Sequence, residues 1–338
     1  MRRVVIAFSV VCGVGWGLLS PLRAAEAQRI QVGQEFINSR TSVLWLAQEK
    51  GFFIKEGIEV DIIPIRGGTA GAQAITSGQV QFSLSATAAS IPAIAAGSDI
   101  VELMNFEPVV AYFLVANKEI TTPAELKGKR VGVSGLGLSN SSLGARLALK
   151  HFGLDPVRDQ IALVAVGTET ERVLAIVSGA VTATVLAPEF KPKAEQAGVQ
   201  VLVDLRTLGI PWAGSNLVTT RRYLQTNRET VDRFLRALLR TIAFIRDPRN
   251  KPVVLGLFRE KLKLEDAIVE QVYRDLLAYY LVPKPYPNLT SIQFLISEAA
   301  AFLPQIGTLK AEQVATLEPL TALDRSGWID SLYRTGAP

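Results

Sequence analysis

The sequence predicts an α/β protein with two lobes, each built around a doubly wound sheet. Short β-rich runs alternate along the chain with helical stretches, which is the pattern of strand–helix units. Two apolar, strand-like segments, 109–116 and 215–219, separate two sets of these units. We therefore expect one lobe at 28–112 and 217–338, a second lobe at 113–216, and two crossover strands between them. The chain has 338 residues, of which 49% are hydrophobic, enough for two cores.

The first set pairs three predicted strands with three predicted helices. The strands are 30–32, 58–64 and 80–84, and the helices are 43–50, 69–77 and 87–96. A glycine follows each helix directly, at Gly51, Gly78 and Gly97. Because glycine adopts the left-handed conformation of a helix C-terminus without steric cost, these positions predict where the helices end.

The second set begins after Pro123 and leads into a helical C-terminal third. Its predicted strands are 130–133, 161–166, 183–186 and 199–204; a Gly/Ser-rich loop at 134–142 leads into a helix that ends at residue 152, and a further helix covers 169–178. Thr226 and Glu229 have the spacing of a capping box, which predicts a helix start. Asp247-Pro248 stops this helix, and amphipathic helices follow at 266–281 and 291–302.

The first 27 residues have the pattern of a secretory signal. Met1-Arg2-Arg3 is followed by an uncharged stretch over 4–19 and by Ala25-Glu26-Ala27, which offers small residues to a signal peptidase. We expect cleavage after Ala27 and a periplasmic mature chain of 338 − 27 = 311 residues. The leader carries a net +2, so the formal charge of +5 becomes +3. An N-terminal anchor is the alternative interpretation.

The composition excludes several classes of function. The chain has one Cys and one His, and Cys12 lies in the leader, so disulfide frameworks and Cys/His metal clusters are excluded. His151 ends a predicted helix, where a histidine is common for structural reasons. The small, scattered positive charge does not favour a nucleic-acid partner. We expect no metal, no cofactor and no catalytic residues.

Six short motifs occur in order along the chain. They are Leu46-Ala47 with Lys50-Gly51-Phe52-Phe53 and Glu56-Gly57-Ile58-Glu59-Val60; Gly67-Gly68-Thr69 with Ile75 and Ser77-Gly78; Pro92-Ala93 with Ala96-Gly97; Leu126-Lys127-Gly128-Lys129-Arg130-Val131-Gly132-Val133; Gly153-Leu154-Asp155-Pro156; and Ser178-Gly179-Ala180-Val181. Together they resemble the ABC-transporter substrate-binding proteins of the nitrate/sulfonate/taurine family, with its thiamine-precursor-like branch. Gln79, Gln81 and Thr182 depart from the family pattern, which is usually acidic in these segments.

The resemblance implies a two-lobed, type II periplasmic-binding-protein fold and a function. A monomer would capture a small organic or oxyanionic solute between the lobes by hinge closure and deliver it to an ABC permease in the inner membrane. Sulfonate, nitrate, carboxylate and pyrimidine ligands all stay open. The alternatives are a pyrimidine-synthase-like enzyme on the same fold and a ligand-sensing module for a membrane receptor. The enzyme would need His and Cys residues that the mature chain scarcely has.

The resemblance also implies a cleft between the lobes, lined by loops that follow the strands. The candidate ligand-binding residues in these loops are Glu35, Phe36, Asn38, Ser39, Arg66, Gly67, Gly68, Thr69, Ser85, Ala86, Thr87, Ser139, Asn140, Ser141, Thr168, Glu169, Glu189 and Trp212. Their hydroxyls, amides and backbone N–H groups suit a small oxyanion, and Arg66 could clamp a carboxylate or sulfonate. The acids would instead favour an amine-bearing ligand or a ring N–H.

Structural roles compete with ligand binding at several of these positions. Phe36 can equally belong to the core, and Asn38 and Ser39 can cap a helix. Arg66 can simply be solvated beside an ordinary strand-to-helix turn. Glu169 is favourable in the first turn of a helix whether or not a ligand binds, and we prefer that interpretation of it.

Overall fold

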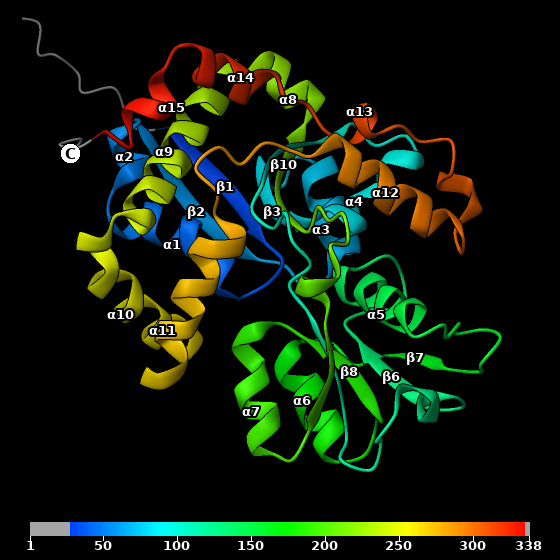
Figure 1. Ribbon diagram of the computed structural model, residues 1–338. Helices are drawn as coiled ribbons and strands as arrows, with labels where there is room; N and C mark the ends of the chain where they lie inside the picture. Colours follow the sequence, from blue (N-terminus) through cyan, green and yellow to red (C-terminus); the bar gives the residue numbers. More distant parts are fainter. Residues whose placement is uncertain (1–27, 335–338) are drawn as a thin grey trace, which may run out of the picture.

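The computed structural model describes residues 28–334, so the predicted signal and Cys12 lie outside the described residues. Two five-stranded sheets organise the chain (Figure 1). The first has the order β2-β1-β3-β10-β4. Its strands are β1 (Gln28–Gln34), β2 (Ile58–Pro64), β3 (Phe82–Ala86), β4 (Ile100–Asn105) and β10 (Ser215–Thr220). β4 was not predicted, and the other four fall where the sequence places them.

The second sheet has the order β7-β6-β8-β5-β9. Its strands are β5 (Phe113–Ala116), β6 (Arg130–Val133), β7 (Ala162–Ala165), β8 (Ala183–Leu186) and β9 (Gln200–Asp204). Figure 1 shows the two sheets in separate lobes, with the segment from β6 to α7 in the lower one. In the described part of the chain, the segments 106–112 and 205–214 connect them. The lobe boundaries at 112 and 216 stay predictions, and β10 begins at Ser215.

Both sheets are mixed, although the strand–helix pattern predicts parallel ones. β5 runs antiparallel to β8 and β9, and β10 runs antiparallel to β3 and β4. The path of the chain explains the difference. A chain that leaves the first sheet at the strand ends facing the cleft enters the second sheet at the strand ends that face the same cleft. The arriving strand therefore runs away from the cleft, opposite to its neighbours.

Short helices cover the sheets and position the loops at the cleft. In the first lobe these are η1 (Ser39–Thr41), α1 (Ser42–Glu49), α2 (Phe52–Lys55), α3 (Gly68–Thr76) and α4 (Thr87–Ala95). In the second they are η2 (Pro123–Leu126), α5 (Asn140–His151), α6 (Glu169–Val177), η3 (Pro188–Phe190), α7 (Lys191–Gln196) and η4 (Leu205–Leu208). The predicted helix ends are confirmed, since Gly51, Gly78 and Gly97 have φ of 69°, 78° and 96°.

The C-terminal third packs on the first lobe as helices. They are α8 (Arg221–Thr226), α9 (Arg228–Arg246), η5 (Pro248–Asn250), α10 (Lys251–Leu262), α11 (Asp266–Asp275), the π-helix η6 (Leu276–Tyr280), α12 (Leu289–Ala300), η7 (Pro304–Ile306), α13 (Ala311–Val314), α14 (Glu318–Arg325) and α15 (Trp328–Ser331). The capping box at Thr226 and Glu229 is wrong. Asn227 precedes α9, and the Thr226 hydroxyl instead donates to the carbonyl of Arg222 in α8.

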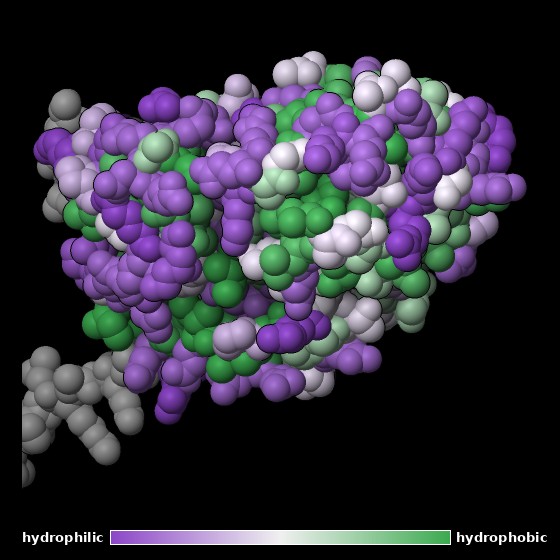
Figure 2. Space-filling model, turned by 90° about the horizontal axis from the view of Figure 1, so that it is seen from below, coloured by the Kyte–Doolittle hydropathy of each residue, from purple (hydrophilic) through white to green (hydrophobic). Residues whose placement is uncertain are grey.

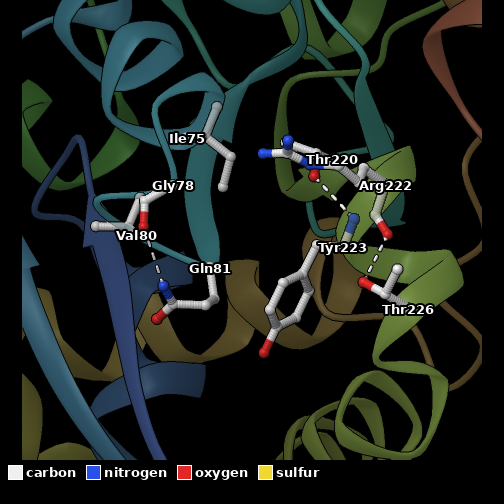
Figure 3. A pocket seen from close by; sticks show the side chains of 8 residues that line it. All are labelled: Ile75, Gly78, Val80, Gln81, Thr220, Arg222, Tyr223 and Thr226. Atoms are coloured by element: carbon white, nitrogen blue, oxygen red, sulfur yellow. Dashed lines mark hydrogen bonds between the residues drawn. The ribbon is translucent and has the colours of Figure 1, made fainter.

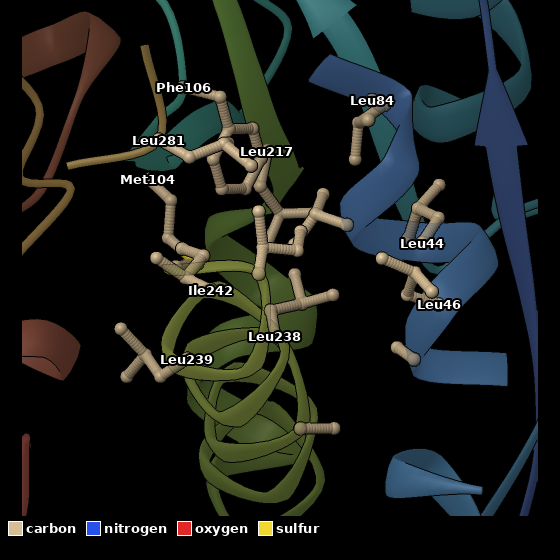
Figure 4. Packing of buried hydrophobic residues seen from close by; sticks show 14 of the residues in the cluster. Leu44, Leu46, Leu84, Met104, Phe106, Leu217, Leu238, Leu239, Ile242 and Leu281 are labelled. Carbon is tan, nitrogen blue, oxygen red and sulfur yellow. The ribbon is translucent and has the colours of Figure 1, made fainter. Parts of the chain in front are cut away.

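Helix α9 forms the centre of the first core (Figure 4). Phe234 stacks on Phe82 of β3 at 4.1 Å between ring centroids and on Phe53 of α2 at 5.1 Å. Leu238 and Ile242 continue the same buried face. Each fully buried side chain of this size contributes about 1.5–3 kcal/mol to stability. This packing holds the first sheet, and with it the loops of the cleft.

The face of the molecule seen from below is mixed in character (Figure 2). Figure 2 shows the molecule from below, where hydrophilic side chains cover much of the face and hydrophobic patches show between them. Several large hydrophobic residues of the second lobe are exposed, including Leu136, Val157 and Leu174. Within residues 28–334, no helix combines the length and apolar character needed to cross a bilayer.

Candidate ligand-binding site

The lobes touch each other where their strands end. Ser39 of the first lobe donates two hydrogen bonds to Oε1 of Glu189 in the second lobe, from its backbone N–H at 3.0 Å and from its hydroxyl. Glu189 follows β8, and Ser39 lies in the turn that follows β1. Asn38 shapes that turn, because its side-chain oxygen accepts from the backbone N–H of Arg40. Asn38 is therefore a cap, as the alternative interpretation holds, while Ser39 reaches across the cleft.

Arg40 is the central cation of the site. Its side chain is buried, with Nε 3.1 Å from Oε2 of Glu107 and Nη1 3.8 Å from Oε1 of Glu189. Its guanidinium lies over the ring of Tyr280, 5.1 Å from the centroid. Burial opposes the charge, but the carboxylates of Glu107 and Glu189 outweigh it and raise the pKa of Arg40. Arg40 therefore stays charged.

Glu107 ties this cation to both connections between the lobes. It lies in the first connection, and its Oε1 accepts from Nε1 of Trp212 in the second connection at 3.0 Å. Its Oε2 accepts from the hydroxyl of Ser215 at 2.6 Å. Trp212 was predicted to reach the cleft. It is fully buried, and its indole N–H supports Glu107. The term inter-lobe cluster is used for five residues: Arg40, Glu107, Glu169, Arg172 and Glu189.

Glu169 and Arg172 hold the wall of the second lobe. Oε1 of Glu169 accepts from the backbone N–H of Ala187 at 2.6 Å and lies 3.4 Å from Nη2 of Arg172. The buried Arg172 also donates to the carbonyls of Gly167 and Val185. Burial raises the pKa of Glu169, and the charge of Arg172 opposes the rise. Thr168 caps α6, because its hydroxyl accepts from the backbone N–H of Glu171.

Glu35 is a further carboxyl group of the first lobe and lies beside α3. Burial raises its pKa to about 8, although hydrogen bonding with Ser85, with the backbone of Ala86 and with Ser83 opposes the rise. A Cβ atom built at Gly71 would lie 1.8 Å from Oε1 of Glu35. The glycine thus makes room for the acid, a close approach that the sequence did not reveal.

The loop after β2 is more open than its neighbours. Arg66, Gly67 and Thr69 are exposed, and Gly67 has a φ of 86°. Gly68 is needed for packing, since a Cβ there would lie 2.2 Å from the Cβ of Ala89. Phe36 is partly buried and packs against the first core, in keeping with the core interpretation.

The serine-rich loop after β6 uses most of its polar groups internally. The Ser139 hydroxyl caps α5 by accepting from the backbone N–H of Ser142 at 3.1 Å. Oγ of Ser141 accepts from the backbone N–H of Ser134 at 2.8 Å. Asn140 is buried and its Oδ1 has no hydrogen-bond partner among the described residues. The structure therefore leaves the Asn140 amide as the group of this loop that can still accept a hydrogen bond.

Thr87, the first residue after β3, belongs to a buried polar network inside the first lobe. The Thr87 hydroxyl donates to Oε2 of Glu102 at 2.9 Å, and Nδ2 of Asn216 donates to the same oxygen at 2.8 Å. Ser85 is buried opposite Asn216 in the sheet, and Ala86 leads into α4. Thr87 is thus committed to Glu102 rather than aimed at the second lobe.

Two further contacts join the lobes at their margins. Arg206 of η4 binds Asp275 of α11 at 3.1 Å and lies over the rings of Phe113 and Tyr279. On the other side, Lys150 of α5 binds Glu298 of α12 at 2.7 Å. The structure thus has its lobes in contact around the inter-lobe cluster.

Two surface cavities are lined by residues outside this cluster. One, of about 210 Å³, lies between the start of β3 and the end of β10, next to Gln81, Arg222 and Tyr223 (Figure 3). It therefore opens at the edge of the sheet opposite the cleft. The other, of about 390 Å³, lies at the end of β1, beside Gln34, Ile37, Trp45 and Lys261.

Sequence reasoning missed Arg40 and Glu107. Arg40 directly follows the predicted residues Asn38 and Ser39. Its position at the start of the next helix was the signal that could have identified it as a site residue. Glu107 is an acid next to a strand-like crossing, and that placement was its only signal. Within residues 28–334, no group of three or more His, Cys, Asp or Glu side chains is arranged to hold a metal ion.

Comparison with known proteins agrees with this architecture. A protein-family model described as NMT1/THI5 like matches residues 38–251, more than half of the 338 residues. The chain belongs to the NMT1/THI5-like family. No curated protein matches it.

Solved structures of binding proteins are similar to this member of the NMT1/THI5-like family. The alkanesulfonate-binding protein SsuA of Xanthomonas axonopodis pv. citri, solved with MOPS, has 20% identity and a TM-score of 0.69, covering 87% of this chain and 100% of its own. The aliphatic sulphonate-binding SsuA of Escherichia coli has 20% identity and a TM-score of 0.65, covering 85% and 91%. The nitrate-binding NrtA of Synechocystis PCC 6803 has 13% identity and a TM-score of 0.71, covering 92% of each. The periplasmic-binding-protein fold is confirmed.

Proposed function

We propose that this protein is the solute-binding component of an ABC importer and closes its two lobes on a small organic or oxyanionic solute. The observation that carries the proposal is the direct contact of the strand-end loops across the cleft, from Ser39 and Arg40 to Glu189. Within residues 28–334 the chain crosses between the lobes through the segments 106–112 and 205–214, which suits hinge opening about these segments. Opening would separate Glu189 from Ser39 and Arg40 and admit a solute.

The compartment and the partner follow from the same proposal. We propose a periplasmic protein, cleaved after Ala27, that acts as a monomer and docks on a permease in the inner membrane. The sulphonate-binding and nitrate-binding proteins of similar fold are described as periplasmic, which supports this assignment. The sulfonate and nitrate bound by such proteins support a small polar solute as the ligand class.

Binding, rather than catalysis, suits the arrangement of the side chains. His151 is the last residue of α5, whose first residue, Asn140, lies at the cleft end of the helix. At 1.5 Å per residue, the histidine is about 16 Å from that end. It is exposed and its ring lies edge-on to Phe152. We therefore assign it a structural role at a helix C-terminus.

Purification from the periplasm without refolding tests the proposal. Native mass spectrometry is expected to show a bound small molecule, and small-angle scattering is expected to show compaction when that molecule is returned to stripped protein. Ser39→Ala is expected to weaken its retention, whereas Ser297→Ala, an exposed serine of the same lobe, keeps it. A protein that retains no solute, responds to none in a thermal-shift screen and instead turns over a substrate would contradict the proposal.

A further inference from the structure

The charges of the inter-lobe cluster do not leave a free cation. Among the described residues, it contains two guanidinium groups, of Arg40 and Arg172, and three carboxylates, of Glu107, Glu169 and Glu189. Arg172 is paired with Glu169, and Arg40 is paired with Glu107 at the shorter of its two ion-pair distances. The cluster then has one negative charge in excess, and it is that of Glu189. An anionic solute would add a further negative charge to a site from which water is excluded, at a high cost in free energy.

The donors that would suit an anion face a carboxylate, to which Ser39 is hydrogen-bonded and Arg40 is ion-paired. The Ser39 N–H, the Ser39 hydroxyl and, at longer range, the Arg40 guanidinium all face Oε1 of Glu189. Glu189 thus places an anion from the second lobe on the donors of the first lobe. A sulfonate or nitrate would have to compete with it for the same groups.

The hydrogen-bonding capacity left over is mixed. Nε and Nη1 of Arg40 lie at ion-pair distance from Glu107 and Glu189 without forming hydrogen bonds, and two buried oxygens also have no partner among the described residues. Oε2 of Glu189 is buried without a hydrogen-bond partner, and so is the hydroxyl of Tyr280, whose ring lies under Arg40. Glu189 as a whole is 4% exposed. A buried carboxylate oxygen without a donor is costly, and a ligand N–H would satisfy it.

The cations at the margin of the cleft do not change this balance. Arg206 binds both Asp204 and Asp275. Arg66, the predicted clamp for an anion, is exposed at the end of β2. The hydrogen bonds from Thr168 lower the pKa of Glu171 in the second lobe, and the charge of Arg66 lowers it further.

We infer that Glu189 determines specificity, by excluding anionic solutes from the donors Ser39 and Arg40 and by binding a solute that carries a primary amine or ammonium group. The inference rests on the proposed function and narrows its ligand class. It separates this chain from the sulfonate-binding and nitrate-binding proteins of similar fold. In the open form the ammonium group would reach Oε2 of Glu189, and closure would bury the pair over Tyr280.

Matched probes with one carbon skeleton test the inference. Ethanolamine, taurine and 2-hydroxyethanesulfonate, together with longer primary amines and nitrate, are titrated by calorimetry into the stripped full-length mature protein. We expect amines to bind at least about tenfold more tightly than the sulfonate of equal length. Glu189→Gln is expected to weaken amine binding about tenfold or more, since hydrogen bonds to charged groups are the strong ones. Glu195→Gln, an exposed acid of the same lobe, leaves binding unchanged.

Tighter binding of the sulfonate or nitrate would overturn the inference, as would an amine affinity that Glu189→Gln does not alter or the absence of binding by every amine. The proposed function has its own readout, the mass of any co-purified solute. A co-purified anion would leave the proposed function standing and refute the inference. Circular dichroism of Glu189→Gln verifies that the variant is folded.

Discussion

Glu102 and Glu107 lie five residues apart, are both almost fully buried, and have opposite surroundings. Glu102 lies in the middle of β4 and accepts hydrogen bonds from the neutral side chains of Thr87, Asn105 and Asn216. Burial raises its pKa to about 7, and these hydrogen bonds oppose the rise. Glu107 lies just past the strand and pairs with the guanidinium of Arg40.

The difference separates a structural acid from an acid of the site. A buried carboxyl group that only neutral groups surround can take up a proton instead of paying the cost of a charge. A carboxylate that supports a buried arginine cannot lose its charge without leaving that arginine unpaired. Both residues are glutamates and both are 1% exposed, so only the groups that contact their carboxyl groups distinguish them.

The largest expected effect comes from applying one substitution to both acids. Glu107→Gln removes a charge that faces Arg40 and is expected to lower the free energy of unfolding by about 3–5 kcal/mol. Glu102→Gln, measured at pH 8 by the same denaturant titration, is expected to cost less than about 1 kcal/mol, because the native charge is unfavourable there. Equal losses in the two variants would abolish the distinction.

The pH dependence of stability sharpens the comparison. The pKa of Glu102 is raised from 4.5 to about 7 in the folded protein, so the folded state holds its proton more tightly. The stability that this provides is present below pH 4.5 and is lost as the pH rises toward 7, by about 3 kcal/mol in total. Glu102→Gln is expected to lack this loss between pH 5 and pH 8, as followed by urea unfolding. Glu35 has the same direction of shift and contributes in both proteins, so the difference between them isolates Glu102.

A smaller effect is expected at the tryptophan that supports Glu107. Trp212→Phe removes the N–H donor to the carboxylate and is expected to lower the free energy of unfolding by about 2 kcal/mol. Trp45→Phe is the matched control, since Nε1 of Trp45 donates to the neutral Oε1 of Gln34 at 3.0 Å in a partly exposed setting. A control variant as damaging as Trp212→Phe in thermal unfolding would show that the charge of the acceptor is unimportant.

The smallest effects are expected at the margins of the cleft. A double-mutant cycle of Arg206→Gln and Asp275→Asn is expected to give a coupling energy of about 1 kcal/mol. The side chains are only 15% and 10% exposed, which strengthens the pair, but Arg206 also binds Asp204, which shares its charge. The Lys150 and Glu298 pair, whose lysine is 68% exposed, is expected to show no measurable coupling. Coupling at Lys150 that exceeds the coupling at Arg206 would contradict the ranking by burial.

The elements were predictable where local patterns decide them. Ile58–Pro64, Arg130–Val133 and Ala183–Leu186 are strands at the predicted bounds, and the glycine after each early helix marks its end. β4 was not predicted, because the polar residues Glu102 and Asn105 interrupt its apolar run, although all six residues are buried in the structure. The false capping box arose because Thr226 is the last residue of α8, and Asn227 alone separates α8 from α9.

The candidate site was predictable only in part. Ser39, Glu169 and Glu189 come together as strand ends at one edge of two sheets, which the order of elements requires. Arg40 and Glu107 were missed because their pairing joins residues 67 positions apart, across a connection whose path the sequence does not specify. Thr87 was predicted for the cleft, yet its hydroxyl bonds to Glu102, a residue of the strand that was not predicted.

The sequence by itself determined the alternation of strands and helices, the two lobes and the family motifs, because each depends on near neighbours in the chain or on their order. The tertiary structure decided which acids are charged and which donors face the cleft. These properties depend on desolvation and on partners brought from the other lobe, and neither is written in the residues next to Arg40, Glu107 or Glu189.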